Sequence, residues 1–361
     1  MCGIAGWINL KEDISKNRDV ILNMTDTLKK RGPDDVGYYF SKNALLGHRR
    51  LVVVDPSGGA QPMSKSVGGR RYIIVYNGEL YNTEDLRKLL IKENYSFNSY
   101  SDTEVLLTSY IHWGINCLKY INGIYAFAIW DESKNQIFMA RDPLGVKPLF
   151  YTVKNNSLIF GSEIKTLLAH PLIEPVVDRD GLTEIFALGP ARSLGGGVFK
   201  GICEVPPANY ILYDKYGIKL REYWKPQCKI HNEDTDTTAQ HVKTLLVDAI
   251  KRQLVADVPV CTLLSGGLDS SVISTVAAAE FKKQGKTLNT YSIDYEDNDK
   301  YFKANSFEPT PDRVWALKMS DYIKSVHHGI INTSSDLADA LYDSVRASDL
   351  PGMADIDSSL Y

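Results

Sequence analysis

The sequence predicts two domains of different fold class: an α+β N-terminal domain of layered sheets and helices, followed by an α/β domain built on a parallel sheet. In the first 224 residues short strand-like runs outnumber helical segments, whereas strands and helices alternate after residue 238. A polar stretch at 225–238, KPQCKIHNEDTDTT, lacks apolar periodicity and indicates a linker. We therefore expect domains at 1–224 and 239–361.

Elements of the first domain follow from short apolar runs and capping residues. Asn82 can cap a helix that carries Leu86 and Leu90. Ser101 or Asp102 can cap a second helix, which ends near Gly114. Runs of apolar, β-branched and aromatic residues predict strands at Ile73–Tyr76, Ile124–Trp130, Gln136–Ala140, Leu149–Thr152 and Leu158–Phe160.

The second domain has the strand–loop–helix–strand pattern of a parallel sheet. Its elements are expected at His241–Val255 (helix), Val258–Leu264 (strand), Asp269–Lys283 (helix), Leu288–Asp294 (strand), Pro311–Lys324 (helix) and Ser335–Ala347 (helix). Ligands of such sheets bind at the carboxyl ends of the strands. The segment Ser265–Ser271 lies at such an end, so it is a candidate ligand site.

Composition excludes several functional classes. Lys+Arg is 41 and Asp+Glu is 44, a net charge of −3, which argues against a nucleic-acid coat or a membrane-surface binder. No apolar run reaches the roughly 18 residues of a membrane span, and the N-terminus lacks a secretory signal pattern. The five cysteines form no CxxC pair, so neither a disulfide framework nor a zinc ribbon is expected. A cytoplasmic protein is the expectation.

A cysteine stands at position 2, directly after the initiator methionine. Methionine before a small residue is normally removed, which would make Cys2 the terminal residue. A terminal cysteine combines a thiol nucleophile with an α-amine of pKa about 7.7–8.0, which can act as its base. Such a site also needs donors for a tetrahedral oxyanion and charged groups that bind the substrate.

Three other segments supply candidates for those roles. In YNGELYN, the Asn77 amide and the Gly78 N–H can form an oxyanion hole side by side, although Asn-Gly is also a common hairpin turn. HRRLVVVD places Arg50 at the mouth of an apolar strand, where it can clamp a carboxylate. In YSDTE, Asp102 can hold a substrate ammonium or act as a helix cap.

MCGIAGW, RGPDD, HRRL, NGELYN, SDTE and RDPLGVKPLFY together resemble the class II glutamine amidotransferase domain, an N-terminal-nucleophile (Ntn) hydrolase family. The resemblance implies an αββα sandwich that converts glutamine to glutamate and ammonia through a γ-glutamyl thioester. It makes Cys2 the nucleophile and its α-amine the base, with Asn77 and Gly78 as the oxyanion hole. By the same resemblance Arg50 holds the α-carboxylate and Asp102 the α-ammonium, and the remaining pocket residues are Leu51, Val52, Val53, Val54 and Glu79.

The segment LLSGGLDSS (263–271) follows an apolar strand and opens a helix. Its glycines let backbone N–H groups point inward, its serines add hydroxyl donors, and the helix N-terminus adds partial positive charge. These features indicate a phosphate cradle. It is not a Walker loop, because no lysine follows the glycines.

SGGLDSS resembles the PP-loop of ATP pyrophosphatases. The resemblance implies ATP and Mg²⁺ as cofactors, with Asp269 as the magnesium ligand. It implies a nucleotide site made of Leu264, Ser265, Gly266, Gly267, Asp269, Ser270, Ser271 and Ile293. The adjacent His327 and His328 could suggest a metal site, but neighbouring side chains rarely bind one ion.

A class II glutaminase followed by a PP-loop domain resembles the glutamine-hydrolysing asparagine synthetase family. The resemblance implies a ligase that uses glutamine, aspartate and ATP, releases AMP and pyrophosphate, and forms a possible homodimer. Members usually continue well past Tyr361 and carry a second Gly-acidic loop, and DSSLY falls within an expected helix. We therefore expect a truncated chain with a partial PP-loop domain. Two alternatives stay open: amidation of another carboxylate acceptor, or a truncated glutaminase or regulatory subunit.

Overall fold

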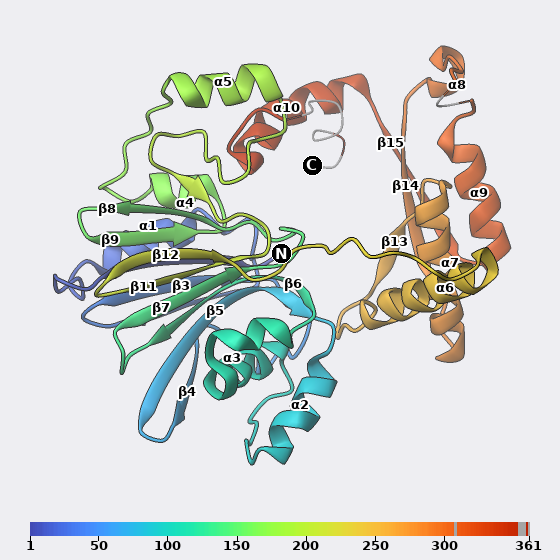
Figure 1. Cartoon of the computed structure of the whole chain (residues 1–361). Coiled ribbons are helices and arrows are strands. Elements are labelled where there is room, and N and C mark those ends of the chain that lie inside the picture. The colour runs from blue at the N-terminus through green and yellow to red at the C-terminus, as the bar shows by residue number, and fades with distance from the viewer. Residues whose placement is uncertain (307–308, 353–358, 360–361) are drawn as a thin grey trace. The chain divides into compact units, whose positions relative to one another are not determined.

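The structure, a computed structural model, describes residues 1–306, 309–352 and 359 (Figure 1). The chain divides into two compact units, Met1–Cys228 and Lys229–Tyr361. The helix expected at DSSLY falls outside the described residues, apart from Ser359. Among the described residues, no helix is long and apolar enough to cross a membrane.

The first unit contains two antiparallel sheets of six strands each. The first sheet has, in spatial order, β10 (Cys203–Glu204), β8 (Phe150–Lys154), β9 (Ser157–Gly161), β1 (Gly3–Asn9), β3 (Ala44–Arg50) and β2 (Asp35–Phe40). The second sheet has β12 (Gly217–Glu222), β11 (Asn209–Asp214), β7 (Gln136–Arg141), β6 (Gly123–Asp131), β5 (Arg70–Leu80) and β4 (Met63–Val67).

The two sheets face each other, and each is covered by helices on its outer side (Figure 1). Alternation along β5 explains the layers: Ile73 and Val75 join the core between the sheets, whereas Ile74 and Tyr76 join the core beneath the helices. Helices α1 (Arg18–Asp26) and α4 (Ile164–Leu168) contact the first sheet, and α2 (Thr83–Lys92) and α3 (Asp102–Trp113) pack on the second. The predicted αββα sandwich is confirmed. A 3₁₀ helix (Gly114–Lys119) and α5 (Arg179–Leu188) complete the unit.

Local differences from the sequence predictions have simple causes. The apolar strand expected over HRRLVVVD ends at Arg50, and residues 51–54 form a loop that the Arg50 side chain holds. Asn82 precedes α2 as predicted, but its side chain bonds the backbone of Tyr120 and Asn122 instead of capping the helix. Ser101 does cap α3, through the Glu104 N–H.

The second unit is a three-stranded parallel sheet with helices, as the strand–helix alternation predicts. Its elements are α6 (Thr235–Arg252), β13 (Cys261–Leu263), α7 (Leu268–Lys283), β14 (Asn289–Tyr295), α8 (Asn298–Tyr301), α9 (Asp312–Ile323), β15 (Val326–Asn332) and α10 (Ser334–Ser348). β14 is the central strand, and α7 and α9 are its crossover helices. β13 is shorter than the Val258–Leu264 run suggests.

Candidate active site

Cys2 lies immediately before β1 and is fixed by contacts with two other segments. The Arg31 Nε donates a 2.7 Å hydrogen bond to the Cys2 carbonyl oxygen, and the Arg31 Nη1 forms a 2.9 Å ion pair with Glu163. The Leu51 N–H donates to the Cys2 Sγ at 3.4 Å, and the thiol donates to the Leu51 carbonyl oxygen at 3.6 Å. The thiol therefore has a defined position before any substrate binds.

Burial shifts the pKa values of the Cys2 thiol and of the Met1 amino group. It raises the pKa of the Cys2 thiol, although the hydrogen bond with the Leu51 backbone opposes this effect. Burial also lowers the pKa of the Met1 amino group. While Met1 is attached, the Cys2 nitrogen belongs to a peptide bond and cannot accept a proton. Removal of Met1 would create an amine beside the thiol, which is the base that this chemistry needs.

Asn77 lies on β5 two residues after Val75. Its side chain is therefore on the same face as those of Ile73 and Val75, the inner face of the second sheet. It is 1% exposed, and its Nδ2 atom is a buried donor without a hydrogen-bond partner. Buried polar groups in folded proteins are nearly always bonded. An unpaired donor beside a nucleophile is the arrangement expected of an oxyanion hole before the oxyanion forms.

Gly78 follows Asn77 and lies opposite Tyr125 in the β5–β6 pair, not in a hairpin turn. Asp142 forms hydrogen bonds with both backbone polar groups of Tyr125. The Asp142 Oδ2 accepts the Tyr125 N–H at 3.3 Å, and the Asp142 backbone N–H donates to the Tyr125 carbonyl at 2.8 Å. Gly78 is therefore in a non-hydrogen-bonded pair, and its N–H points away from β6. A Cβ at Gly78 would lie 2.3 Å from the Ile124 carbonyl oxygen, so only glycine fits.

The neighbouring N–H groups on the same edge of β5 bind side chains. The Tyr76 N–H donates to the Gln61 Oε1 at 2.7 Å, and the Leu80 N–H donates to the Asp102 Oδ2 at 3.1 Å. The Gly78 N–H lies between these two on an edge that β4 does not cover, because β4 pairs only with residues 70–74. Asn77 and Gly78 thus offer a side-chain donor and a backbone donor at adjacent positions.

Arg50 has a role that the sequence does not reveal. Three of its N–H groups bind backbone carbonyls of the following loop: Nη1 binds Pro56 at 3.0 Å, and Nη2 binds Val54 at 3.2 Å and Asp55 at 2.6 Å. A Cβ at Gly59 would lie 2.3 Å from this guanidinium. Two of the five guanidinium N–H groups remain for a substrate carboxylate.

Asp102 is the first residue of α3 and is held by two donors. Its Oδ2 accepts the Tyr76 hydroxyl at 2.9 Å and the Leu80 N–H at 3.1 Å. Burial raises the pKa of Asp102 to about 6, against the lowering effect of these two bonds. A carboxylate kept in a poorly solvated place gains most from a cation, so Asp102 suits the α-ammonium of an amino acid.

One cavity joins nearly all the predicted glutaminase residues. Its walls include Cys2, Arg50, Leu51, Val53, Val54, Asn77, Gly78, Glu79 and Asp102. Val52 lies in the same loop but donates its N–H to the Asp34 Oδ2 at 2.8 Å. The cavity also includes residues that the sequence analysis missed: Met1, Gly59, Gln61, Tyr76, Ser101, Thr103 and Lys147.

Lys147 brings a cation to this cavity from the RDPLGVKPLFY segment. Its Nζ lies 3.3 Å from the Met1 Sδ, and the Arg31 Nη2 lies 3.7 Å from the same sulfur. Burial lowers the pKa of Lys147, while the nearby acidic groups, Glu79 first among them, oppose that change. The motif had signalled the family, but only the tertiary contacts place its lysine near the thiol.

In the second unit, the predicted phosphate cradle joins β13 to the N-terminus of α7. The Ser265 Oγ accepts the Gly267 N–H at 3.3 Å and contacts the Ser270 Oγ at 3.1 Å. Gly266 has a φ of +87°, and a Cβ there would lie 2.6 Å from the Ala316 nitrogen. The loop is therefore tightly wound over α9, with its hydroxyls at the helix N-terminus.

The other predicted nucleotide residues are placed around this loop. The Leu264 N–H donates to the Tyr291 carbonyl at 2.7 Å, so the loop starts as an extension of the β13–β14 pair. Ile293 lies on β14 itself, whereas Asp269 and Ser271 are in the first turn of α7. The Ser271 N–H bonds the Gly267 carbonyl.

His327 and His328 do not share a ligand site. His327 places its two ring nitrogens 3.0 Å from the hydroxyls of Thr290 and Ser292. His328 stacks on Tyr291 with ring centroids 4.6 Å apart. Adjacent residues of a strand point to opposite faces. Within the part of the chain that the structure describes, no three His, Cys, Asp or Glu residues are grouped as a metal site.

The family models match in the order of the two units. Residues 1–224 match the family model described as "Glutamine amidotransferase domain". The chain belongs to this glutamine amidotransferase family. Its glutamine amidotransferase domain contains the whole cavity around Cys2. Residues 241–361 match the family model described as "Asparagine synthase". Both domain families that the motifs predict are therefore present.

Two relatives are similar to most or all of this chain. The chain is 53% identical over 361 residues to asparagine synthetase [glutamine-hydrolyzing] 3 of Bacillus subtilis, covering 100% of this chain and 59% of that protein. It is 36% identical to a putative asparagine synthetase [glutamine-hydrolyzing] 2 of Methanocaldococcus jannaschii, covering 91% of this chain and 64% of that protein. The chain thus spans about six tenths of the length of these relatives.

Proposed function

We propose that the first unit hydrolyses glutamine to glutamate and ammonia, with Cys2 as the nucleophile. The observation that carries this proposal is the unpaired, buried Nδ2 of Asn77 on the wall of the cavity that also holds Cys2. Leaving such a donor unpaired costs about 1–3 kcal/mol. An oxyanion formed on a substrate bound to Cys2 would satisfy it. Glutamate release by the Met-cleaved 361-residue chain tests the proposal, and no release would contradict it.

The chemistry proceeds in two stages at Cys2. The α-amine accepts the thiol proton, and the sulfur forms a bond to the δ-carbon of glutamine while the carbonyl oxygen becomes an oxyanion bound by Asn77 and Gly78. The protonated amine then gives its proton to the departing nitrogen, so that ammonia leaves and a γ-glutamyl thioester remains. Water, deprotonated by the amine, breaks the thioester and yields glutamate and the free thiol.

Charged groups around the cavity select the substrate. The Asp102 carboxylate would bind the α-ammonium of glutamine, and the free N–H groups of Arg50 would bind its α-carboxylate. Glu79 and the loop at 51–54 would complete the pocket, with Val52 held by its bond to Asp34. This assignment explains why a buried arginine and a buried aspartate line the same cavity.

Glutamine use should depend on the ionisation of Asp102. Since its pKa is about 6 in the free protein, the carboxylate is protonated as the pH falls below that value and can no longer bind an ammonium. We expect kcat/KM for glutamine, relative to that of Asp102→Asn, to fall about tenfold for each pH unit well below 6, because protonation of the α-amine lowers both in the same way. A pH–rate profile between pH 4.5 and 8, compared with that of Asp102→Asn, measures this. The same acid limb in Asp102→Asn would contradict the assignment.

We further propose that the whole protein uses this ammonia in the ATP-dependent amidation of aspartate to asparagine, with release of AMP and pyrophosphate. The proposal is supported by the asparagine synthase match at 241–361 and by the names of the relatives. ATP would react with the β-carboxylate of aspartate to form an acyl-adenylate and pyrophosphate. Ammonia would then displace AMP.

The loop at 264–271 fits the phosphates of ATP, because hydroxyls and a helix N-terminus converge there. Magnesium would enter with the nucleotide. Among the described residues Asp269 has no companions that would make a closed metal site, so phosphate oxygens would supply the other ligands, as is usual for this ion. Asp269 would then hold the metal at the phosphates, where the ion neutralises their charge.

Nucleotide binding gives a direct test of this loop. We expect the 361-residue chain to bind ATP more tightly with Mg²⁺ than with EDTA, with a Kd below about 1 mM. Asp269→Asn should remove most of the difference between the two conditions, as measured by calorimetry, whereas Asp299→Asn, an exposed change on α8, should keep it. An equal Kd for ATP with Mg²⁺ and with EDTA in the wild-type chain would contradict the metal role of Asp269.

We propose a cytoplasmic protein that takes small-molecule substrates, and a homodimer as its assembly. The near balance of charge supports the absence of nucleic-acid partners. Sedimentation of the purified chain over a range of concentrations tests the dimer, and a monomer at every concentration would contradict it.

A further inference from the structure

Glu104 is a buried acid that the proposed hydrolysis does not use. It lies on the first turn of α3, two residues after Asp102, and is only 4% exposed. We propose that Glu104 is a positioning residue: it holds the segment 96–101 so that Asp102 meets the ammonium of the substrate. This inference rests on the proposed hydrolysis of glutamine.

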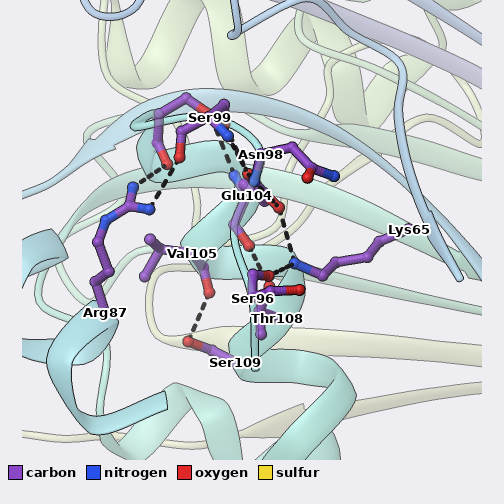
Figure 2. A network of polar contacts seen from close by, with 10 residues as sticks. Lys65, Arg87, Ser96, Asn98, Ser99, Glu104, Val105, Thr108 and Ser109 are labelled. Carbon is purple, nitrogen blue, oxygen red and sulfur yellow. Dashed lines mark hydrogen bonds and ion pairs between the residues drawn. The ribbon is translucent and has the colours of Figure 1, made fainter. Parts of the chain in front are cut away.

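The Glu104 carboxylate binds the segment from inside (Figure 2). Its Oε2 accepts the Ser99 N–H at 2.8 Å, the Ser99 hydroxyl at 2.8 Å and the Asn98 N–H at 3.0 Å. Its Oε1 accepts the Lys65 ammonium at 2.8 Å and the Asn98 N–H at 3.1 Å. Every bond is charge-assisted, so the set resists displacement by water.

Two cations bind the carbonyl groups of the same segment. Lys65, from β4, donates to the Ser96 carbonyl at 2.7 Å, and Arg87, from α2, donates to the carbonyls of Ser99 at 2.9 Å and Ser101 at 3.3 Å. Both cations also lie over the ring of Phe97, at 4.7 and 4.6 Å from its centroid. An irregular segment without sheet or helix bonds of its own is thereby fixed at nearly every residue (Figure 2).

The fixed segment is connected to the cavity both through Asp102 and through the loop that Arg50 holds. It leads directly into Asp102, and Ser101 and Asp102 are both on the cavity wall. The Tyr100 N–H donates to the Asp55 Oδ2 at 3.0 Å, and Asp55 belongs to the loop that Arg50 holds. A change at Glu104 should therefore move the ammonium-binding side of the cavity while it leaves Cys2, just before β1, and Asn77, on β5, in place.

The lowered pKa of Glu104 supports a stable ion pair between Glu104 and Lys65. Burial would raise the pKa of Glu104, but the bonds from Lys65, Ser99 and the backbone N–H groups outweigh it and hold that pKa below its usual range. Glu104 therefore stays ionised wherever Asp102 does. Glutamine at this position would keep the size of the side chain, but its NH₂ group would face hydrogen-bond donors and could not accept from them.

The test compares glutamine with glutaramate, which has the same amide but no α-amino group. The wild-type, Met-cleaved chain should prefer glutamine, and Asp102→Asn should lose that preference. We expect Glu104→Gln to reduce the ratio of the two kcat/KM values by about tenfold or more, through loss of glutamine binding alone. Glu93→Gln, an exposed change at the end of α2, should keep the wild-type ratio.

A folded Glu104→Gln protein that keeps the wild-type ratio, or loses both substrates in equal proportion, would overturn the positioning role. If Glu104→Gln does not fold, Ser99→Ala replaces it, since that change removes only the hydroxyl bonds to Glu104 and Ser101; an unchanged ratio in Ser99→Ala then overturns the inference. A wild-type chain that releases no glutamate contradicts the proposed hydrolysis itself, which is a separate result.

Discussion

Replacement of Cys2 by alanine is expected to abolish the release of glutamate from glutamine. The sulfur is the only proposed nucleophile, and its loss leaves the cavity walls, the Arg31 bond to the residue-2 carbonyl and the fold unchanged. Loss of a covalent nucleophile typically costs about 10⁴-fold or more in rate. Coupled measurement of glutamate, with hydroxylamine present to capture the thioester, follows both stages.

The matched control for this variant is Cys228→Ala, which removes an exposed thiol from the end of the first unit. It should retain full activity. In a chain extended to the length of the relatives, Cys2→Ala should still use free ammonia for amidation. Loss of ammonia use together with glutamine use would argue against two separate sites.

Replacement of Asn77 by alanine is expected to lower kcat by about 10²–10³-fold with little change in KM. The reason is that the unpaired Nδ2 is satisfied only when charge develops on the substrate oxygen. Stability should hardly fall and can rise, because the substitution removes a buried polar group that has no partner. Steady-state kinetics and a thermal melt together measure these two effects.

Asn17→Ala provides the comparison for Asn77→Ala, since Asn17 is exposed and its side chain does not cap α1. It should change neither kcat nor KM. A tenfold rise in KM for Asn77→Ala with an unchanged kcat would place Asn77 in ground-state binding and not at the oxyanion.

Much of the fold could be predicted from the sequence because its strands are short runs of apolar, β-branched and aromatic residues. In β5, successive apolar residues pack into two different cores, and the same alternation holds in β6 and β7. The parallel sheet followed from one strand–loop–helix–strand pattern. The end of β3 at Arg50 could not be predicted, because the Val-rich run after it looks like a strand and only the three carbonyls bound by that arginine make it a loop.

The residues that line the cavity could be predicted where one short motif supplies each of them, as with Cys2, Asn77 and Asp102. They could not be predicted where their placement depends on contacts between distant segments. Lys147 reaches the cavity from a distant loop, and its contact with Met1 spans 146 residues. In the sequence, Glu104 is recognisable only as a residue of the first turn of a helix, whereas its bond to Lys65 joins residues 39 positions apart.

The way in which residue 2 is held has a practical consequence. Its carbonyl is bonded to Arg31 and its thiol to Leu51, whereas the Met1 sulfur, a weak acceptor, contacts two cations. The cavity is thus assembled while Met1, itself one of its lining residues, is still attached, and cleavage should supply a base while the bonds of residue 2 to Arg31 and Leu51 remain. A preparation with a retained methionine or an N-terminal tag should have the melting temperature of the mature protein and yet not hydrolyse glutamine. Correct folding is therefore no proof that this domain is active.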